Sequence, residues 1–156
     1  MDDGADTYAR YSGYLDQFVQ VWIERDRVTR VAFRETVDES VSDAHDLLDR
    51  IDGYLTGTIT EEFADVSVAP MESTIASRVY TAVRSIPYGT DASVEMIEQT
   101  LYEDDPSQPV DPQEIRQALL DNPIPIIIPD HRVRDGPSGA PPIVEQRLRA
   151  LEAPGT

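Results

Sequence analysis

Short apolar runs rich in β-branched and aromatic residues dominate the first part of the chain. One run covers residues 18–23 and a second covers residues 28–33, with a charged turn between them. These runs predict a β-hairpin, and a pair of tyrosines ahead of them predicts an earlier strand. Apolar residues at helical spacing predict a helix over residues 43–55, and a last apolar run predicts a strand over residues 63–68.

The second part of the chain is predicted to be mainly helical. Aspartate, proline and glutamate at positions 111, 112 and 114 form the pattern of a capped helix start. The isoleucine run at residues 126–128 predicts a short buried strand. Pro70 and Met71 predict a boundary between a domain of residues 1–70 and a domain of residues 71–156. Apolar spacings of three and four predict helices over residues 73–86, 93–101, 111–121 and 142–152.

The charge of the chain is unusual for its 156 residues. There are 30 acidic side chains against 13 basic ones, all of the basic ones are arginine, and the formal net charge is -17. Dense carboxylates without lysine are typical of a protein from a very salty cytoplasm, so the composition predicts an acidic, halophilic protein. The acidic first residues and the lack of a long apolar run predict a cytoplasmic protein with no membrane partner.

The absence of cysteine removes several kinds of chemistry. Without a thiol the chain has no disulfide, no cysteine-ligated zinc or iron–sulfur cluster, and no thiolate nucleophile. No glycine-rich phosphate loop or dinucleotide motif is present, so no cofactor is predicted. His45, which lies among aspartates, is interpreted as a surface residue, and no metal site is predicted.

Three stretches carry a resemblance to a known family: residues 86–89, residues 122–133 and residues 148–152. They resemble the methylated-DNA–protein-cysteine methyltransferases, whose signature is Asn-Pro, a short apolar strand and Pro-Cys-His-Arg-Val. The resemblance implies an α/β N-terminal ribonuclease-H-like domain followed by a mainly α, winged helix-turn-helix C-terminal domain. It also implies that a recognition helix enters the minor groove and that the damaged nucleotide is flipped out toward the cysteine.

The acceptor position of this signature holds Asp130 instead of cysteine. A carboxylate is a much weaker nucleophile toward an alkyl carbon than a thiolate, so methyl transfer is predicted to be absent. The resemblance implies that His131 and Glu152 correspond to the pair that activates the thiol. It also implies that Asn122 is the hinge asparagine that ties the signature turn together.

The resemblance also assigns positions that would meet DNA. The arginine that fills the gap left by the flipped base is replaced by Gln113, with Arg116 one turn further along the helix, and the phosphate-rotating tyrosine is replaced by Val94. Compared with family spacing, the loop at residues 134–142 is shortened, and the acidic loop at residues 102–110 is longer. The candidate DNA contacts are Tyr88, Val94, Gln113, Arg116 and Arg132.

Three functions follow as alternatives. The first is a homologue similar to alkyltransferase-like proteins, which binds duplex DNA with an alkylated guanine for repair and transfers no methyl group. The second is an interaction or regulatory protein that has lost DNA binding, and in both cases a repair or regulatory protein is a candidate partner. The third is an enzyme that uses Asp130 and His131 for hydrolysis.

Overall fold

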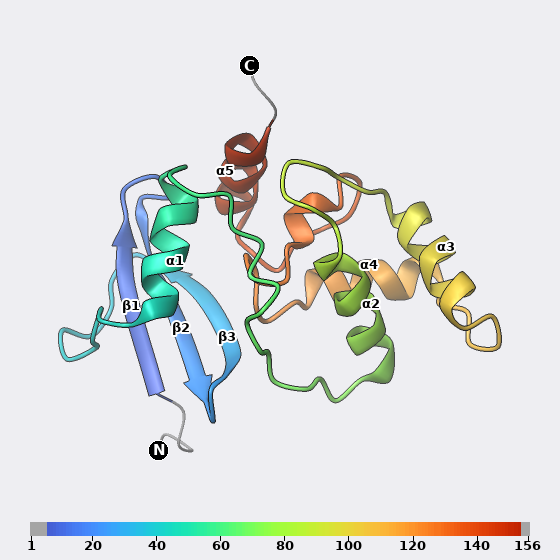
Figure 1. Cartoon of the computed structure of the whole chain (residues 1–156), viewed down its shortest axis with the longest axis horizontal. Coiled ribbons are helices and arrows are strands. Elements are labelled where there is room, and N and C mark those ends of the chain that lie inside the picture. Colours follow the sequence, from blue (N-terminus) through green and yellow to red (C-terminus); the bar gives the residue numbers. More distant parts are fainter. Residues whose placement is uncertain (1–5, 154–156) are drawn as a thin grey trace. The chain divides into compact units, whose positions relative to one another are not determined.

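The computed structural model describes residues 6–153, and the chain divides into two compact units between Ala69 and Pro70. The first unit contains an antiparallel sheet of β1 (Asp6–Ser12), β2 (Gln17–Glu24) and β3 (Arg27–Arg34), in that order, and the helix α1 (Asp46–Leu55). The predicted hairpin and the earlier strand are therefore confirmed. Figure 1 shows α1 lying along the sheet.

The core of the first unit lies between this helix and the sheet. Val19 on β2 is buried, as are Leu48 and Ile51 on α1, and these side chains surround one small cavity. The helix begins three residues later than predicted, because the His45 side chain accepts a hydrogen bond from the Leu47 N–H and caps it.

The predicted strand over residues 63–68 is wrong. Phe63 has a left-handed backbone with φ of 54°, which interrupts an extended run, and Val68 forms only an isolated bridge with Val28. Glu61 supports this turn, since its carboxylate accepts the Phe63 N–H and pairs with Arg50.

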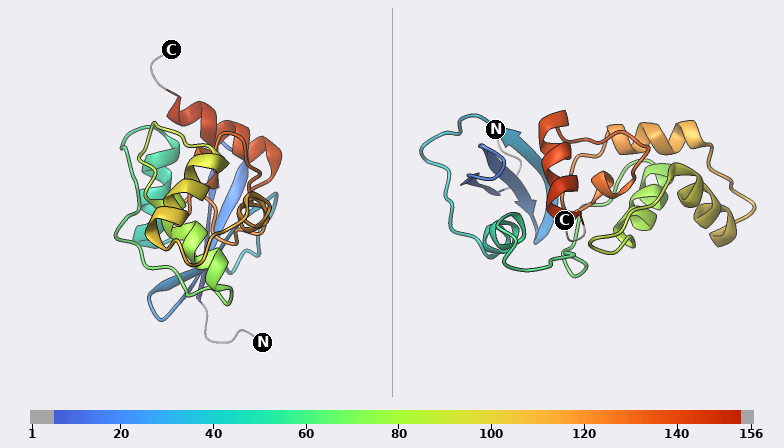
Figure 2. Two further views of the ribbon diagram at one scale, coloured as in Figure 1. Left: turned by 90° about the vertical axis from the view of Figure 1, so that its right-hand side faces the viewer. Right: turned by 90° about the horizontal axis from the view of Figure 1, so that it is seen from above.

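The second unit contains the four predicted helices, which are confirmed as α2 (Thr74–Arg84), α3 (Val94–Asp104), α4 (Pro112–Leu120) and α5 (Pro142–Glu152). Helix α4 begins with the capping box predicted at Asp111 and Glu114. Helices α2, α3 and α4 pack on one another around buried aliphatic residues (Figure 2). Tyr80 joins α2 to α4 by donating a hydrogen bond of 2.6 Å to the Ala118 carbonyl, and its burial raises the pKa of the phenol to about 12.

The predicted strand at residues 126–128 is also wrong, although all three isoleucines are buried. Ile126 has φ of 76°, and the Ile128 N–H bonds back to the Ile124 carbonyl, so this stretch is a folded turn. The Asn122 side chain supplies the bonds that a neighbouring strand would supply. Its carbonyl accepts the Ile124 N–H and its amide donates to the Ile128 carbonyl.

Candidate functional site

The folded turn at residues 126–128 leads into η1 (Asp130–Arg132), a single 3₁₀ turn. The three side chains of η1 are charged or polar and are buried in the second unit. The backbone after η1 is fixed to the segment before α3. The Ala92 N–H donates to the Arg132 carbonyl and the Arg134 N–H donates to the Ala92 carbonyl, both at 2.9 Å. These two hydrogen bonds hold the backbone that carries Asp130, His131 and Arg132 against the segment before α3.

Asp130 is fully buried and is held by three donors of no net charge. It accepts hydrogen bonds from the Ser138 hydroxyl at 2.6 Å, the Gly139 N–H at 2.8 Å and the Asn122 amide at 2.9 Å. Burial raises the pKa of Asp130, while these three hydrogen bonds and the nearby His131 act in the opposite direction. Both carboxylate oxygens are engaged within the chain.

The loop after η1 covers the Asp130 carboxylate. Gly139 lies so close to the Asn122 backbone carbonyl that any side chain there would collide with it. Ser138 is buried, and its hydroxyl also accepts the Ala140 N–H at 3.0 Å. Sequence reasoning did not identify Ser138 or Gly139 as site residues, although a Ser-Gly pair in the shortened loop offered a signal.

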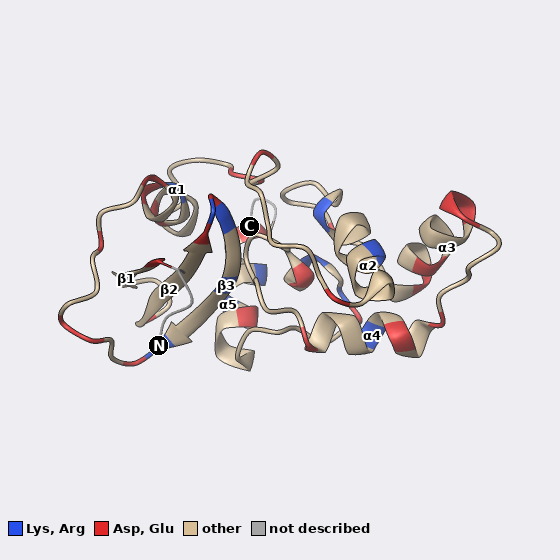
Figure 3. Ribbon diagram, turned by 90° about the horizontal axis from the view of Figure 1, so that it is seen from below, with Lys and Arg blue, Asp and Glu red and all other residues tan. Residues whose placement is uncertain are grey.

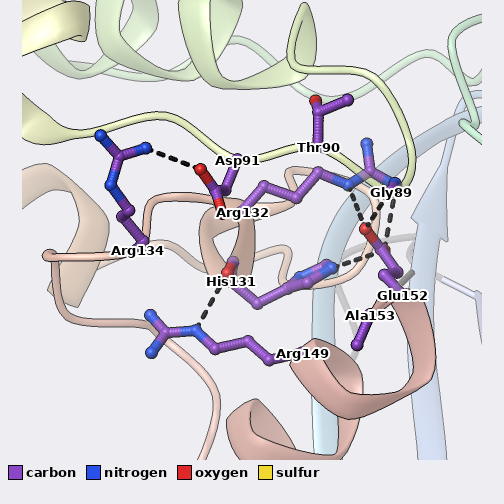
Figure 4. A pocket seen from close by; sticks show the side chains of 9 residues that line it. All are labelled: Gly89, Thr90, Asp91, His131, Arg132, Arg134, Arg149, Glu152 and Ala153. Atoms are coloured by element: carbon purple, nitrogen blue, oxygen red, sulfur yellow. Dashed lines mark hydrogen bonds and ion pairs between the residues drawn. The ribbon is translucent and has the colours of Figure 1, made fainter. Parts of the chain in front are cut away.

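The buried partner of His131 is Glu152, at the end of α5. The His131 Nε2 lies 2.7 Å from one Glu152 oxygen, and the Arg132 Nε donates to the other at 2.7 Å. Arg132 also donates to the Ile86 carbonyl at 2.7 Å, which fixes the end of the segment after α2. Figure 4 shows the His131 and Arg132 side chains converging on the Glu152 carboxylate.

A pocket of about 200 Å³ lies beside this cluster, and its lining does not include Asp130. Arg149 on α5 closes one side of it by donating to the backbone carbonyls of His131 and Val133, both at 3.0 Å. On the other side Arg134 pairs with Asp91 at 2.6 Å (Figure 4). Arg149 is a third residue that sequence reasoning missed, because an arginine on a helix has no pattern that predicts backbone carbonyl partners.

Residues 74–150 match the family described as the DNA binding domain of 6-O-methylguanine DNA methyltransferase. Residues 74–150 belong to this family of DNA binding domains. The family resemblance carried by residues 86–89, 122–133 and 148–152 is therefore confirmed, and the chain contains no cysteine.

Similar proteins and structures extend over almost the whole chain. A methylated-DNA–protein-cysteine methyltransferase of Metallosphaera sedula is 27% identical over 154 residues, which are 94% of this chain and 94% of the relative. The crystal structure of Mycobacterium tuberculosis O6-methylguanine methyltransferase is 23% identical, has a TM-score of 0.70, and is matched over 97% of this chain and 96% of its own. The structure of M. tuberculosis OGT in complex with DNA is 24% identical with a TM-score of 0.69, over 94% of this chain and 89% of its own. The fold, an N-terminal sheet followed by a helical part, is that of the methyltransferase family.

The candidate DNA contacts of this family member lie in two different environments. Gln113 is exposed in the first turn of α4, and Arg116 is half-buried one turn later. Val94 is 1% exposed and Arg132 is 4% exposed, so neither side chain is available to a DNA backbone in this structure. Tyr88 is half-buried, and the Arg132 guanidinium lies 5.7 Å from the centre of its ring.

Within residues 6–153, no three His, Asp or Glu side chains lie close enough together to hold a metal ion. None of the helices in the same range is both long enough and apolar enough to cross a membrane.

Proposed function

We propose that this chain is a member of the methyltransferase family that binds duplex DNA carrying an alkylated guanine and does not take up the alkyl group. The observation that carries the proposal is the state of Asp130, which is fully buried and accepts three hydrogen bonds. A nucleophile needs an accessible lone pair pointing at the alkyl carbon. The Asp130 oxygens instead point at Asn122, Ser138 and Gly139.

The same contacts argue against the hydrolytic alternative. An Asp130 nucleophile or base would have to give up at least one of its donors, and each buried hydrogen bond to a charged group stabilises the fold by about 1.5–3 kcal/mol. His131 is turned toward Glu152. Its geometry supports a structural ion-pair cluster that joins η1 to α5.

DNA binding is proposed from the family match and from one edge of α4. Gln113, Arg116 and Leu120 follow one another at helical spacing along that edge, and Leu120 is 53% exposed. The M. tuberculosis OGT, which has the same fold, has been solved in complex with DNA, and this supports DNA binding by the present chain. We propose further that α3 and α4 form the helix-turn-helix of a winged-helix domain and that the first unit is a reduced ribonuclease-H-like domain.

Intact-protein mass spectrometry tests the lack of transfer. The chain is incubated with duplex DNA containing O6-methylguanine, and no gain of about 14 Da, the mass of one transferred methyl group replacing a proton, is expected. A stoichiometric adduct would refute the non-transferring role.

Fluorescence anisotropy in potassium chloride solutions up to molar concentration tests DNA binding. Duplexes with and without methylguanine are compared, and tighter binding of the methylated duplex is expected. Arg116→Ala is expected to weaken binding to both duplexes by the same factor, as for a backbone contact, whereas Arg25→Ala in the exposed β2–β3 turn is the matched control. No binding to either duplex at any salt concentration would remove the DNA role.

A second candidate function is an interaction protein without DNA binding. The specific observation in its favour is the charge near the recognition helix: Glu114 is exposed on α4, Asp121 is exposed directly after α4, and Glu103 and Asp104 are exposed at the end of α3. Figure 3 shows red stretches on both helices. Such carboxylates repel DNA phosphates at low salt. No binding to either duplex in the anisotropy experiment, together with no methyl adduct, would favour this candidate.

A further inference from the structure

A groove of about 400 Å³ lies between α2 and α4, and we call it the α2–α4 groove. Its floor is formed by apolar groups that include Ile75 and Ala118. Ile75 is half-buried, so the helix packing leaves part of this aliphatic side chain uncovered. An uncovered apolar floor in a groove is typical of a site that accepts apolar side chains of a partner.

The rim of the α2–α4 groove is acidic and lacks an arginine. Glu72, Glu114 and Asp121 line it, and all three are exposed. The other two large pockets of the second unit differ, since the groove between α2 and α3 includes Arg78 and the pocket beside Glu152 includes three arginines. The rim is therefore more uniformly negative than the other openings described in the same unit.

The groove uses a different edge of α4 from the one proposed for DNA. Glu114, Gln117 and Asp121 recur at spacings of three and four and line the groove. Gln113 directly precedes Glu114, and Arg116 directly precedes Gln117. Neighbouring residues of a helix are about 100° apart around its axis, so Gln113 and Arg116 lie on a different edge from the groove residues. Figure 3 shows both a blue stretch and a red stretch along α4. Helix α4 thus presents one neutral-to-basic edge and one acidic edge.

We propose that the α2–α4 groove is the docking site for a basic amphipathic segment of another protein. Apolar side chains of that segment would enter the floor beside Ile75 and Ala118. Its arginine or lysine side chains would meet the carboxylates of Glu72, Glu114 and Asp121. Helix-in-groove recognition has this form, with apolar anchors for affinity and complementary charge for orientation and selectivity. The proposal does not depend on DNA binding, because it uses a different edge of α4.

The first test measures binding of two synthetic fluorescent peptides to the full chain at the lowest salt concentration at which it stays folded. One peptide has leucines at helical spacing and arginines elsewhere, and the other has glutamates in place of the arginines. The basic peptide is expected to bind and the acidic peptide is not. Equal binding of the two peptides, or no binding of the basic one, would overturn the proposal.

The second test locates the site. In the double variant Glu72→Arg, Asp121→Arg, binding of the basic peptide is expected to weaken about tenfold or more. Arginine at position 121 suits the C-terminal end of α4, so this variant is expected to fold. The double variant Glu35→Arg, Glu39→Arg makes the same change in net charge at exposed positions outside the groove and is the matched control. If both double variants lost the same binding affinity for the basic peptide, the net charge alone would explain the loss and the proposal would be overturned.

Two further arms keep the result unambiguous. Ile75→Asn makes the groove floor polar without changing the net charge, and it is also expected to weaken binding of the basic peptide. Unchanged binding would contradict an apolar anchor at Ile75. Unlabelled duplex DNA is added as a competitor at constant ionic strength. Displacement of the peptide by DNA would assign the groove to nucleic acid and overturn the protein-docking proposal, whereas retention of the peptide supports it.

Discussion

Two buried carboxylates in the second unit are stabilised in opposite ways. Glu152 is surrounded by cationic or ionisable partners, with His131 Nε2 and Arg132 Nε each 2.7 Å away. Asp130 is surrounded by donors of no net charge, from Ser138, Gly139 and Asn122. A buried charge needs a partner charge or a complete set of hydrogen bonds, and each carboxylate uses one of these solutions.

The two carboxylates join η1 to different parts of the second unit. The Glu152 cluster joins η1 to α5 by charge. The Asp130 contacts join η1 to the loop at residues 134–141 by hydrogen bonds. Both Asp130 oxygens face donors of the protein itself, so in this structure the side chain links η1 to Asn122 and to the loop that follows η1.

The largest effect is expected for Glu152→Gln. Removing one member of a buried ion pair leaves Arg132 without its charge partner, and the expected loss is about 3–5 kcal/mol of unfolding free energy. Urea denaturation at constant potassium chloride measures it. The control is Asp91→Asn, which breaks the exposed pair with Arg134 and is expected to cost less than about 1 kcal/mol. Similar losses in both variants would show that burial does not distinguish the two pairs.

Ser138→Ala is expected to have the next largest effect. It removes a buried hydrogen bond of 2.6 Å to Asp130, and a bond of this kind to a charged group contributes about 1.5–3 kcal/mol. Ser107→Ala is a closely matched control, because Ser107 donates a bond of the same length to Asp105 at the surface. Urea denaturation is expected to show no measurable change for Ser107→Ala. If Ser138→Ala were equally neutral, the Asp130 contacts would not stabilise the loop.

Asp130→Asn is expected to have the smallest effect, with a dependence on pH that identifies its cause. The amide can keep all three bonds, since its oxygen accepts from Gly139 and Asn122 and its NH₂ group donates to Ser138. Burial raises the pKa of Asp130, so the folded chain binds this proton more tightly than the unfolded chain. The stability of the natural chain relative to Asp130→Asn therefore falls as pH rises from the unfolded-state pKa through the raised folded-state pKa.

Urea denaturation at a series of pH values across this window checks the prediction. The stability difference between Asp130→Asn and the natural chain is expected to grow with pH in favour of the variant and to become constant above the folded-state pKa. A difference that grows in the opposite direction would mean that the hydrogen bonds from Ser138, Gly139 and Asn122 outweigh burial.

Local sequence signals predicted most of the fold correctly. The cap at Asp111 and the apolar spacing of α4 and α5 identified both helices, because helix starts and helix faces depend on residues within one or two turns of each other. The two predicted strands that are wrong, at residues 63–68 and 126–128, contain apolar residues that are buried without being extended. In both places a polar side chain, Glu61 or Asn122, holds the turn, and hydrophobic periodicity does not report this.

The residue identities alone determined that this chain has no thiol for an alkyl group and that it is strongly acidic, because both follow from composition. Only the tertiary structure decided what Asp130 does instead. Its donors Ser138 and Gly139 are eight and nine residues away, and Glu152 meets His131 across 21 residues. Bonds between such positions form only when the chain has closed its loops, so no local pattern contains them. The tertiary packing likewise decided which edge of α4 faces the α2–α4 groove, since that depends on where α2 lies.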